Sequence, residues 1–157
     1  MLRELSDNTY YELRSKLQNE CGFKTRWDAP ADWIALPKPH KRFAVGPCWN
    51  EEQEKLVNSF FESLSKKEIY AYDWQSDCFL YSPSEEIEPY YCYYDSERER
   101  EVCFPTYYPD GEFHFFFDTD WQYGLFGHPI RNEIVVMGQE LVEMFEANAL
   151  KLDIAEV

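Results

Sequence analysis

Residues 69–81 read IYAYDWQSDCFLY, and this stretch decides the fold class. Residues 69–74 and 78–81 are rich in aromatic and other apolar side chains, which favour β-strands. The three residues between them, Gln-Ser-Asp, are polar and typical of a tight turn. The stretch therefore predicts two strands joined by a short turn, which is how neighbouring strands of an antiparallel sheet are connected.

Further strands are predicted on both sides of this pair. They are expected at residues 90–94, 102–107, 112–118 and 134–137, where aromatic and β-branched side chains recur. Residues 109–111 read PDG, a strong turn signal just before the third of these strands. Residues 121–129 stay ambiguous because two glycines and a proline interrupt them. Residues 27–49 contain four prolines, so we expect an irregular connector there with one short strand at residues 33–36.

Helices are predicted at residues 7–20, 50–67 and 139–150. The middle helix begins at Asn50 with glutamates in its first turn, and its apolar side chains then recur at helical spacing. Helices at both ends with strands between them indicate the α+β class. We therefore expect residues 1–157 to form a single α+β domain: one antiparallel sheet of about five to six strands, packed by N-terminal, middle and C-terminal helices.

The charge of the chain is strongly negative and unevenly distributed. The formal net charge is −15; residues 1–67 hold 11 basic and 10 acidic side chains, whereas residues 68–157 hold 4 and 20. Such a field repels nucleic acid and anionic lipid, whose binding depends on lysine and arginine. It attracts a basic protein surface and speeds the encounter with it. The alternative is that the acidic surface only keeps the protein soluble.

The composition also bears on location. No apolar run approaches the roughly 20 residues that a membrane span needs, and no apolar signal segment follows the first charges. We therefore expect a cytoplasmic protein without a membrane partner. The cysteines form no CxxC pair and are expected to be reduced thiols; they are Cys21, Cys48, Cys78, Cys92 and Cys103.

The densest group of polar side chains comprises His114, Asp118, Asp120 and His128. Two histidines and two carboxylates could hold a divalent metal, but they have no recognised ligand spacing, so no metal and no cofactor are expected. His128 lies between a glycine and a proline, where it could serve as a general base or anchor a loop by hydrogen bonding. No nucleophile motif surrounds any cysteine or serine, so no catalytic residues are assigned.

Trp74 stands between Asp73 and Asp77 in the predicted turn region. An exposed tryptophan among acidic residues would be a good anchor for a partner protein, because tryptophan is common at interface hot spots. The alternative is a core tryptophan beneath a polar turn. The sequence leaves both open.

Three motifs resemble an uncharacterised bacterial family, domain-of-unknown-function family 2716. They are YAYDWQ at residues 70–75, YPDGEF at 108–113 and GLFGHP at 124–129, and the resemblance extends over about residues 10–146. The family commonly has His where this chain has Ser76, and Trp where it has Ile130. The resemblance brings no established catalytic residues. Small acidic members of such families often look like immunity proteins of bacterial toxin systems, which is an analogy.

We therefore expect an immunity protein (antitoxin) that is not an enzyme and that binds a cognate toxin domain with a basic surface. Its acidic, aromatic binding surface is predicted to include Asp73, Trp74, Asp77, Glu85, Glu86, Glu88, Asp118, Asp120 and Trp121. A small enzyme or ligand-binding domain that uses His114, Asp118 and His128 is the alternative, and an adaptor without a toxin is a third possibility.

Overall fold

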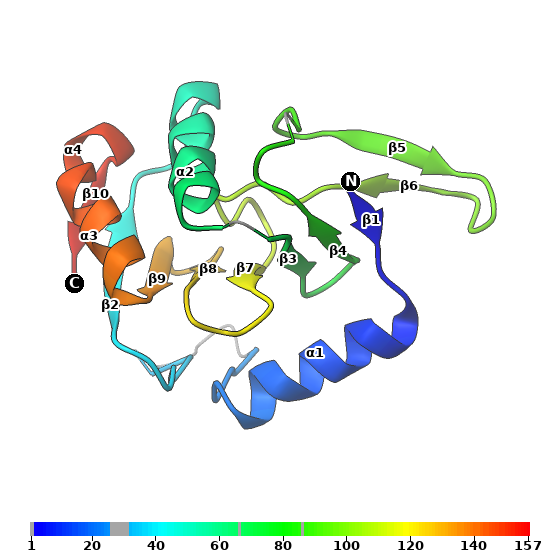
Figure 1. Ribbon diagram of the computed structural model, residues 1–157, viewed down its shortest axis with the longest axis horizontal. Helices are drawn as coiled ribbons and strands as arrows, with labels where there is room; N and C mark the ends of the chain where they lie inside the picture. Colours follow the sequence, from blue (N-terminus) through cyan, green and yellow to red (C-terminus); the bar gives the residue numbers. More distant parts are fainter. Residues whose placement is uncertain (1, 26–31, 66, 86) are drawn as a thin grey trace.

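The computed structural model describes residues 2–25, 32–65, 67–85 and 87–157 (Figure 1). Its elements are, in order, β1 (Arg3–Glu4), α1 (Asp7–Asn19), β2 (His40–Val45), α2 (Glu51–Leu64), β3 (Ile69–Asp73), β4 (Cys78–Tyr81), β5 (Cys92–Asp95), β6 (Arg100–Cys103), β7 (His114–Asp118), β8 (Gly124–His128), β9 (Glu133–Met137), α3 (Gln139–Ala147), α4 (Ala149–Leu152) and β10 (Ile154–Glu156).

The described strands form two antiparallel sheets. The large sheet has eight strands in the order β1-β4-β3-β7-β8-β9-β2-β10, and β5 and β6 form a separate hairpin. The α+β class and the antiparallel sheet are confirmed, but the expected five to six strands are too few. The edge strands β1 and β10 have two and three residues, too short to show a pattern, and β8 reads GLFGH, whose glycines hide its strand character.

The helices cover both faces of the large sheet (Figure 1). On one face α2 and α3 pack against the sheet through side chains such as Phe61 and Phe145. On the other face α1 packs through Leu13 and Leu17. Because side chains alternate between the two faces of a strand, each central strand contributes to both cores. In β7, Phe116 packs on the α2 and α3 side, whereas Phe115 and Phe117 pack on the α1 side.

The predicted helices and the first strand pair are confirmed within a few residues, but the connector was predicted wrongly. The strand lies at His40–Val45, not at residues 33–36. Trp33, Ile34 and Leu36 are instead an irregular buried segment of the core on the α1 side. These residues are apolar because they are buried in the core, and this made the segment look like a strand although it does not pair with one. The C-terminal helix also divides at Asn148, into α3 and α4.

Two cysteines correct the expectation that all five are reduced. Cys92 and Cys103 face each other across the β5–β6 hairpin and form a disulfide. Cys21, Cys48 and Cys78 are free thiols. Within the described residues, no helix is both long and apolar enough to cross a membrane.

The disulfide can be tested by counting the reactive thiols of the denatured protein. Protein purified without reductant and then denatured should show three thiols that react with a disulfide reagent, because only three cysteines are free. After reduction the count should rise to five. A Cys92→Ser/Cys103→Ser variant is the control and should show three thiols under both conditions. Five thiols in the unreduced wild-type protein would contradict the pairing.

Candidate functional site

Two adjoining pockets lie on the α2 side of the large sheet, on either side of residues 104–106. The first, here the helix pocket, has a volume of about 350 Å³ and lies between α2, residues 83–85 and 87–89, and residues 104–107. The second, here the hairpin pocket, has a volume of about 320 Å³ and lies between the end of β3, the β5–β6 hairpin and the start of β7. Both are lined by Phe104, Pro105 and Thr106.

Carboxyl groups outnumber basic groups in the lining of both pockets. The helix pocket is lined by Glu54, Glu62, Glu85 and Glu88 with Lys55 as its basic residue. The hairpin pocket is lined by Asp73, Asp77, Glu101, Asp110 and Glu112 with Arg100 and His114. Each basic residue is already engaged by a carboxylate, Lys55 by Glu51 and Arg100 by Asp77. The negative charge that the two pockets present is carried mainly by the exposed carboxylates Glu62, Glu88, Glu101 and Asp110.

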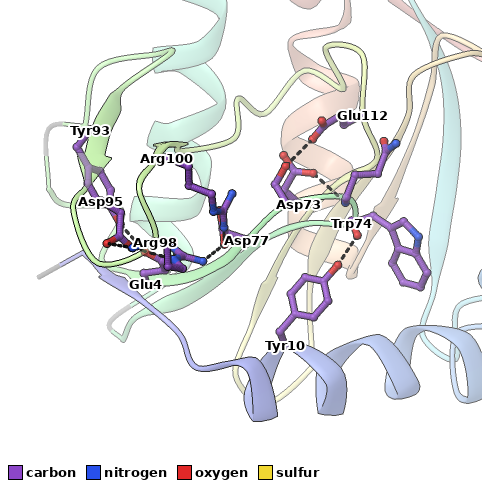
Figure 2. Close-up of polar contacts among 12 residues, drawn as sticks. Glu4, Tyr10, Asp73, Trp74, Asp77, Tyr93, Asp95, Arg98, Arg100 and Glu112 are labelled. Atoms are coloured by element: carbon purple, nitrogen blue, oxygen red, sulfur yellow. Dashed lines mark hydrogen bonds and ion pairs between the residues drawn. The ribbon is translucent and has the colours of Figure 1, made fainter.

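Asp73, Glu112 and His114 come together at the base of the hairpin pocket. The antiparallel register places Asp73 of β3 directly opposite His114 of β7, so their side chains share one face of the sheet. His114 Nε2 lies 3.6 Å from Asp73 Oδ2. Glu112 reaches the same point from just before β7, and its carboxyl group is hydrogen-bonded to Asp73 (Figure 2).

Burial controls the protonation of this group. It raises the pKa of Asp73 to about 9, with the hydrogen bond and the charge of Glu112 adding to the effect. Burial also lowers the pKa of His114. The backbone carbonyl groups of Tyr108 and Thr106 favour the charged ring and act in the opposite direction, but burial is the larger effect. At neutral pH, Asp73 therefore holds a proton next to Glu112, and His114 is a neutral imidazole.

Asp77 fixes the hairpin to the large sheet. Its Oδ1 accepts hydrogen bonds from Arg98 Nη1 at 2.9 Å and Arg100 Nη2 at 2.7 Å (Figure 2). Arg98 also pairs with Glu4 of β1 and with Asp95 of β5. These ion pairs hold the β5–β6 hairpin as the wall of the pocket.

Glu54 forms the floor of the helix pocket. It is only 5% exposed, and its two carboxylate oxygens accept hydrogen bonds from the backbone N–H groups of Tyr107 and Tyr108 at 2.8 and 3.0 Å. Burial outweighs these bonds and raises the pKa of Glu54 to about 7. The glutamate of α2 thus positions the segment that separates the two pockets.

The prediction that Trp74 is an exposed anchor is wrong. Trp74 is 4% exposed and packs against Phe23 and Phe115 in the core on the α1 side. The guanidinium of Arg14 covers its ring at 4.0 Å, and its carbonyl accepts a hydrogen bond from Tyr10 (Figure 2). The polar residues around Trp74 belong to the turn after β3, so the sequence around it did not indicate that its ring is buried.

Asp118, at the end of β7, and Asp120 and Trp121, in the turn after it, lie away from both pockets. The carboxylate of Asp118 is buried and accepts hydrogen bonds from the N–H groups of Asp120, Gln122 and Tyr123. Asp120 is exposed, and half-buried Trp121 stacks on Phe117 of β7. These contacts make Asp118 a residue that shapes the turn.

The other predicted acidic residues fall into three groups. Asp73 and Asp77 line the hairpin pocket. Glu85 and Glu88 line the helix pocket, where Glu85 is half-buried and Glu88 is exposed. Glu86 lies outside the described residues.

His114, Asp118 and His128 do not converge. His114 faces the α2 side, and Asp118 is at the other end of β7. His128 is fully buried on the α1 side, where its ring contacts Trp33 and Phe113. Its Nδ1 accepts hydrogen bonds from the N–H groups of residues 130 and 131, and burial lowers its pKa to about 4. His128 therefore anchors a loop, as one of its two interpretations predicted.

Sequence reasoning missed several pocket residues. Glu54, Glu62, Glu101, Asp110 and Glu112 were not among the predicted binding residues. One signal was available: Glu112 and His114 are two residues apart in a predicted strand, which places them on one face. The pairing of that strand with β3, which brings in Asp73, cannot be read from either segment alone.

Comparisons with known proteins agree with the resemblance. The chain matches the model of a family described as "Protein of unknown function (DUF2716)" over residues 4–142. It is 30% identical over 127 residues to "Uncharacterized protein YxiI" of Bacillus subtilis (strain 168), a match that covers 72% of this chain and 74% of that protein. No solved structure matches the chain. Since the family model spans most of the sequence, the chain belongs to the DUF2716 family.

Proposed function

We propose that this protein is an immunity protein that binds and neutralises a toxin domain through the acidic face formed by the helix pocket and the hairpin pocket. It acts by binding and not by catalysis. The observation that carries the proposal is the lining of the two pockets, in which carboxyl groups far outnumber bases and each base is held by a carboxylate.

The charge complementarity argues for a basic protein partner. Exposed carboxylates at Glu62, Glu88, Glu101 and Asp110 stand around openings whose walls are protein. Charges of one sign in a cleft with low-dielectric walls focus the field and raise the rate of association with an oppositely charged partner. Lysine and arginine side chains of a toxin that acts on nucleic acid or nucleotides have the chemistry to enter such pockets.

Exposed tyrosines supply the aromatic part of the proposed interface. Tyr90 lines the hairpin pocket and is 60% exposed, and Tyr91 and Tyr94 are exposed nearby on the β5–β6 side. Tyrosine is enriched in interfaces because its ring is apolar and its hydroxyl can bond to a partner. These tyrosines replace buried Trp74 as the proposed aromatic anchors.

Charge reversal in the two pockets should weaken binding. Glu88→Lys/Asp110→Lys places one positive charge at each opening, and we expect it to lower the association rate constant for the toxin at least about tenfold at low salt. The difference should shrink at high salt, because exposed charges are screened. The measurement is toxin binding by stopped flow, together with growth rescue in cells that co-express the toxin encoded beside this gene.

Glu12→Lys/Glu20→Lys is the matched control. Both glutamates are exposed, Glu12 on α1 and Glu20 at the C-terminal end of α1, on the opposite face of the sheet, so two reversals there should leave rescue and association unchanged. Wild-type protein that neither rescues growth nor co-purifies with that toxin would rule out the proposal. Equal effects of the control and the pocket variant would rule out this binding face.

A further inference from the structure

We propose that Asp73, Glu112 and His114 form a binding site for one divalent transition-metal ion at the base of the hairpin pocket. The proposal does not depend on a toxin, because the site lies within a single chain. It also differs from the histidine and aspartate set that the sequence suggested, since only His114 is common to both.

The donor atoms match the needs of such an ion. Asp73, Glu112 and His114 each offer one ligand atom, and these atoms all lie within 4.8 Å of one another. One imidazole and two carboxylates are ligands that zinc accepts, and three protein ligands with an open fourth position are typical of a reactive zinc site. With metal–ligand bonds of about 2.1 Å, the edge of a tetrahedron is about 3.4 Å. The separation of 3.6 Å between His114 Nε2 and Asp73 Oδ2 is close to that edge.

His114 is held in the orientation that a ligand requires. Its Nδ1 lies 2.9 Å from the carbonyl oxygen of Thr106 and 3.0 Å from that of Tyr108, so Nδ1 carries the proton and donates it. The lone pair is then on Nε2, which points toward Asp73. A backbone carbonyl that fixes the tautomer in this way is the usual outer partner of a metal-binding histidine. His114 is 5% exposed, and within the described residues its Nε2 makes no hydrogen bond.

The carboxyl groups of the site are placed where a bound cation could balance them. Asp73 and Glu112 are adjacent carboxyl groups, and in the described part of the chain no lysine or arginine pairs with either of them. Arg100, which lines the same pocket, is bound by Asp77. Asp77 is 6% exposed, and its second oxygen, Oδ2, is buried and has no hydrogen-bond partner among the described residues. A bound dication would displace the proton that Asp73 holds at neutral pH and would balance the charges of the two carboxylates.

The site can also be reached. It opens into the hairpin pocket, whose volume of about 320 Å³ is ample for a hydrated ion, and Glu112 at its entrance is half-buried. Buried donors at the base and an accessible carboxylate at the rim would let an ion exchange its waters for protein ligands one at a time.

Metal titration of the purified chain tests the proposal. Chelator-treated wild-type protein should bind one Zn²⁺ per chain by calorimetry, and Zn²⁺ should raise its Tm. Co²⁺ used in place of Zn²⁺ should give visible d–d absorption without a thiolate charge-transfer band. Asp73→Asn and His114→Gln should each weaken Zn²⁺ binding at least about 100-fold, because each removes a direct ligand.

Two further variants make the outcome decisive. Glu112→Gln changes a half-buried side chain and should also lose Zn²⁺ binding. It tests the site even if the variants of the buried residues Asp73 and His114 fail to fold. Cys92→Ser/Cys103→Ser should bind as the wild type does. It removes the two thiols that, if reduced, could hold a metal together with Glu101. The proposal is wrong if wild-type protein binds no Zn²⁺ or Co²⁺, if Glu112→Gln binds normally, or if binding is lost with the cysteines. None of these outcomes depends on whether a toxin is neutralised.

Discussion

Replacement of Glu133 with alanine is expected to lower the free energy of unfolding by about 3 to 5 kcal/mol, the cost of breaking a buried ion pair by removing one partner. Glu133 is 4% exposed and lies at the start of β9. Its carboxylate accepts hydrogen bonds from Arg42 Nε at 2.7 Å, Arg42 Nη2 at 3.0 Å and Trp33 Nε1 at 3.0 Å. Alanine would leave these donors without their acceptor. Chemical denaturation monitored by circular dichroism measures the loss.

The loss should depend on pH in a defined direction. Burial alone would raise the pKa of Glu133, but the hydrogen bonds from Arg42 and Trp33 outweigh it and hold the pKa below 4.5. Between the folded pKa and 4.5 the unfolded chain binds more protons, so the stabilisation by Glu133 is complete above pH 4.5 and is lost as the pH falls through the folded pKa. The difference between wild type and variant should therefore shrink in acid.

Glu146→Ala is the matched control. Glu146 pairs with Lys41 at 2.9 Å, close to the distance between Glu133 and Arg42, but both side chains of this pair are more than a third exposed. Exposed ion pairs contribute little to stability, so no measurable change is expected. A loss as large as that of Glu133→Ala would contradict the view that burial decides the effect.

The structure separates what local pattern can predict from what it cannot. The α2 stripe and the β3–β4 pair were predicted correctly, because amphipathic periodicity and turn chemistry are local. The β2 strand was missed because prolines surround it and because its pairing with β9 and β10 is set by residues about 90 or more positions away. Long-range pairing leaves no mark in a short stretch of sequence.

The same limit applies to the site. Asp73 and His114 were both selected from the sequence, but for different functions, because only the β3–β7 register shows that they face each other. One of the two interpretations of Trp74 placed its side chain on the surface, because its neighbours in the sequence are polar. The face that a side chain takes at the end of a strand is decided by tertiary packing, here against Phe23 and Phe115.

Replacement of Glu54 with alanine is the second change that should lower the stability of the fold strongly. The same carboxyl group also positions the segment that borders both pockets. We expect Glu54→Ala to lower the free energy of unfolding by about 2 to 6 kcal/mol in mildly acidic solution, because two buried N–H groups would lose their acceptors at about 1 to 3 kcal/mol each. Those groups belong to Tyr107 and Tyr108, whose segment borders the helix pocket and the hairpin pocket. Denaturation as a function of pH measures the loss.

The sign of the pH dependence is opposite to that of Glu133. Because the pKa of Glu54 rises from 4.5 to about 7 on folding, the folded protein binds more protons than the unfolded chain between these values. The stabilising contribution of Glu54 is therefore complete below pH 4.5 and declines as the pH rises to 7, by about 3 kcal/mol for this shift. The loss in Glu54→Ala should be largest near pH 4.5 and much smaller at pH 8.

Glu62→Ala, an exposed glutamate of the same helix and the same pocket, should show no such dependence. A loss in Glu54→Ala that grows with pH would mean that the two N–H bonds outweigh burial, and that Glu54 is ionised in the folded protein. In that case the floor of the helix pocket would carry a full negative charge at neutral pH, and its attraction for a basic side chain would be stronger. The pH profile of one variant thus decides the charge that a partner meets at the bottom of this pocket.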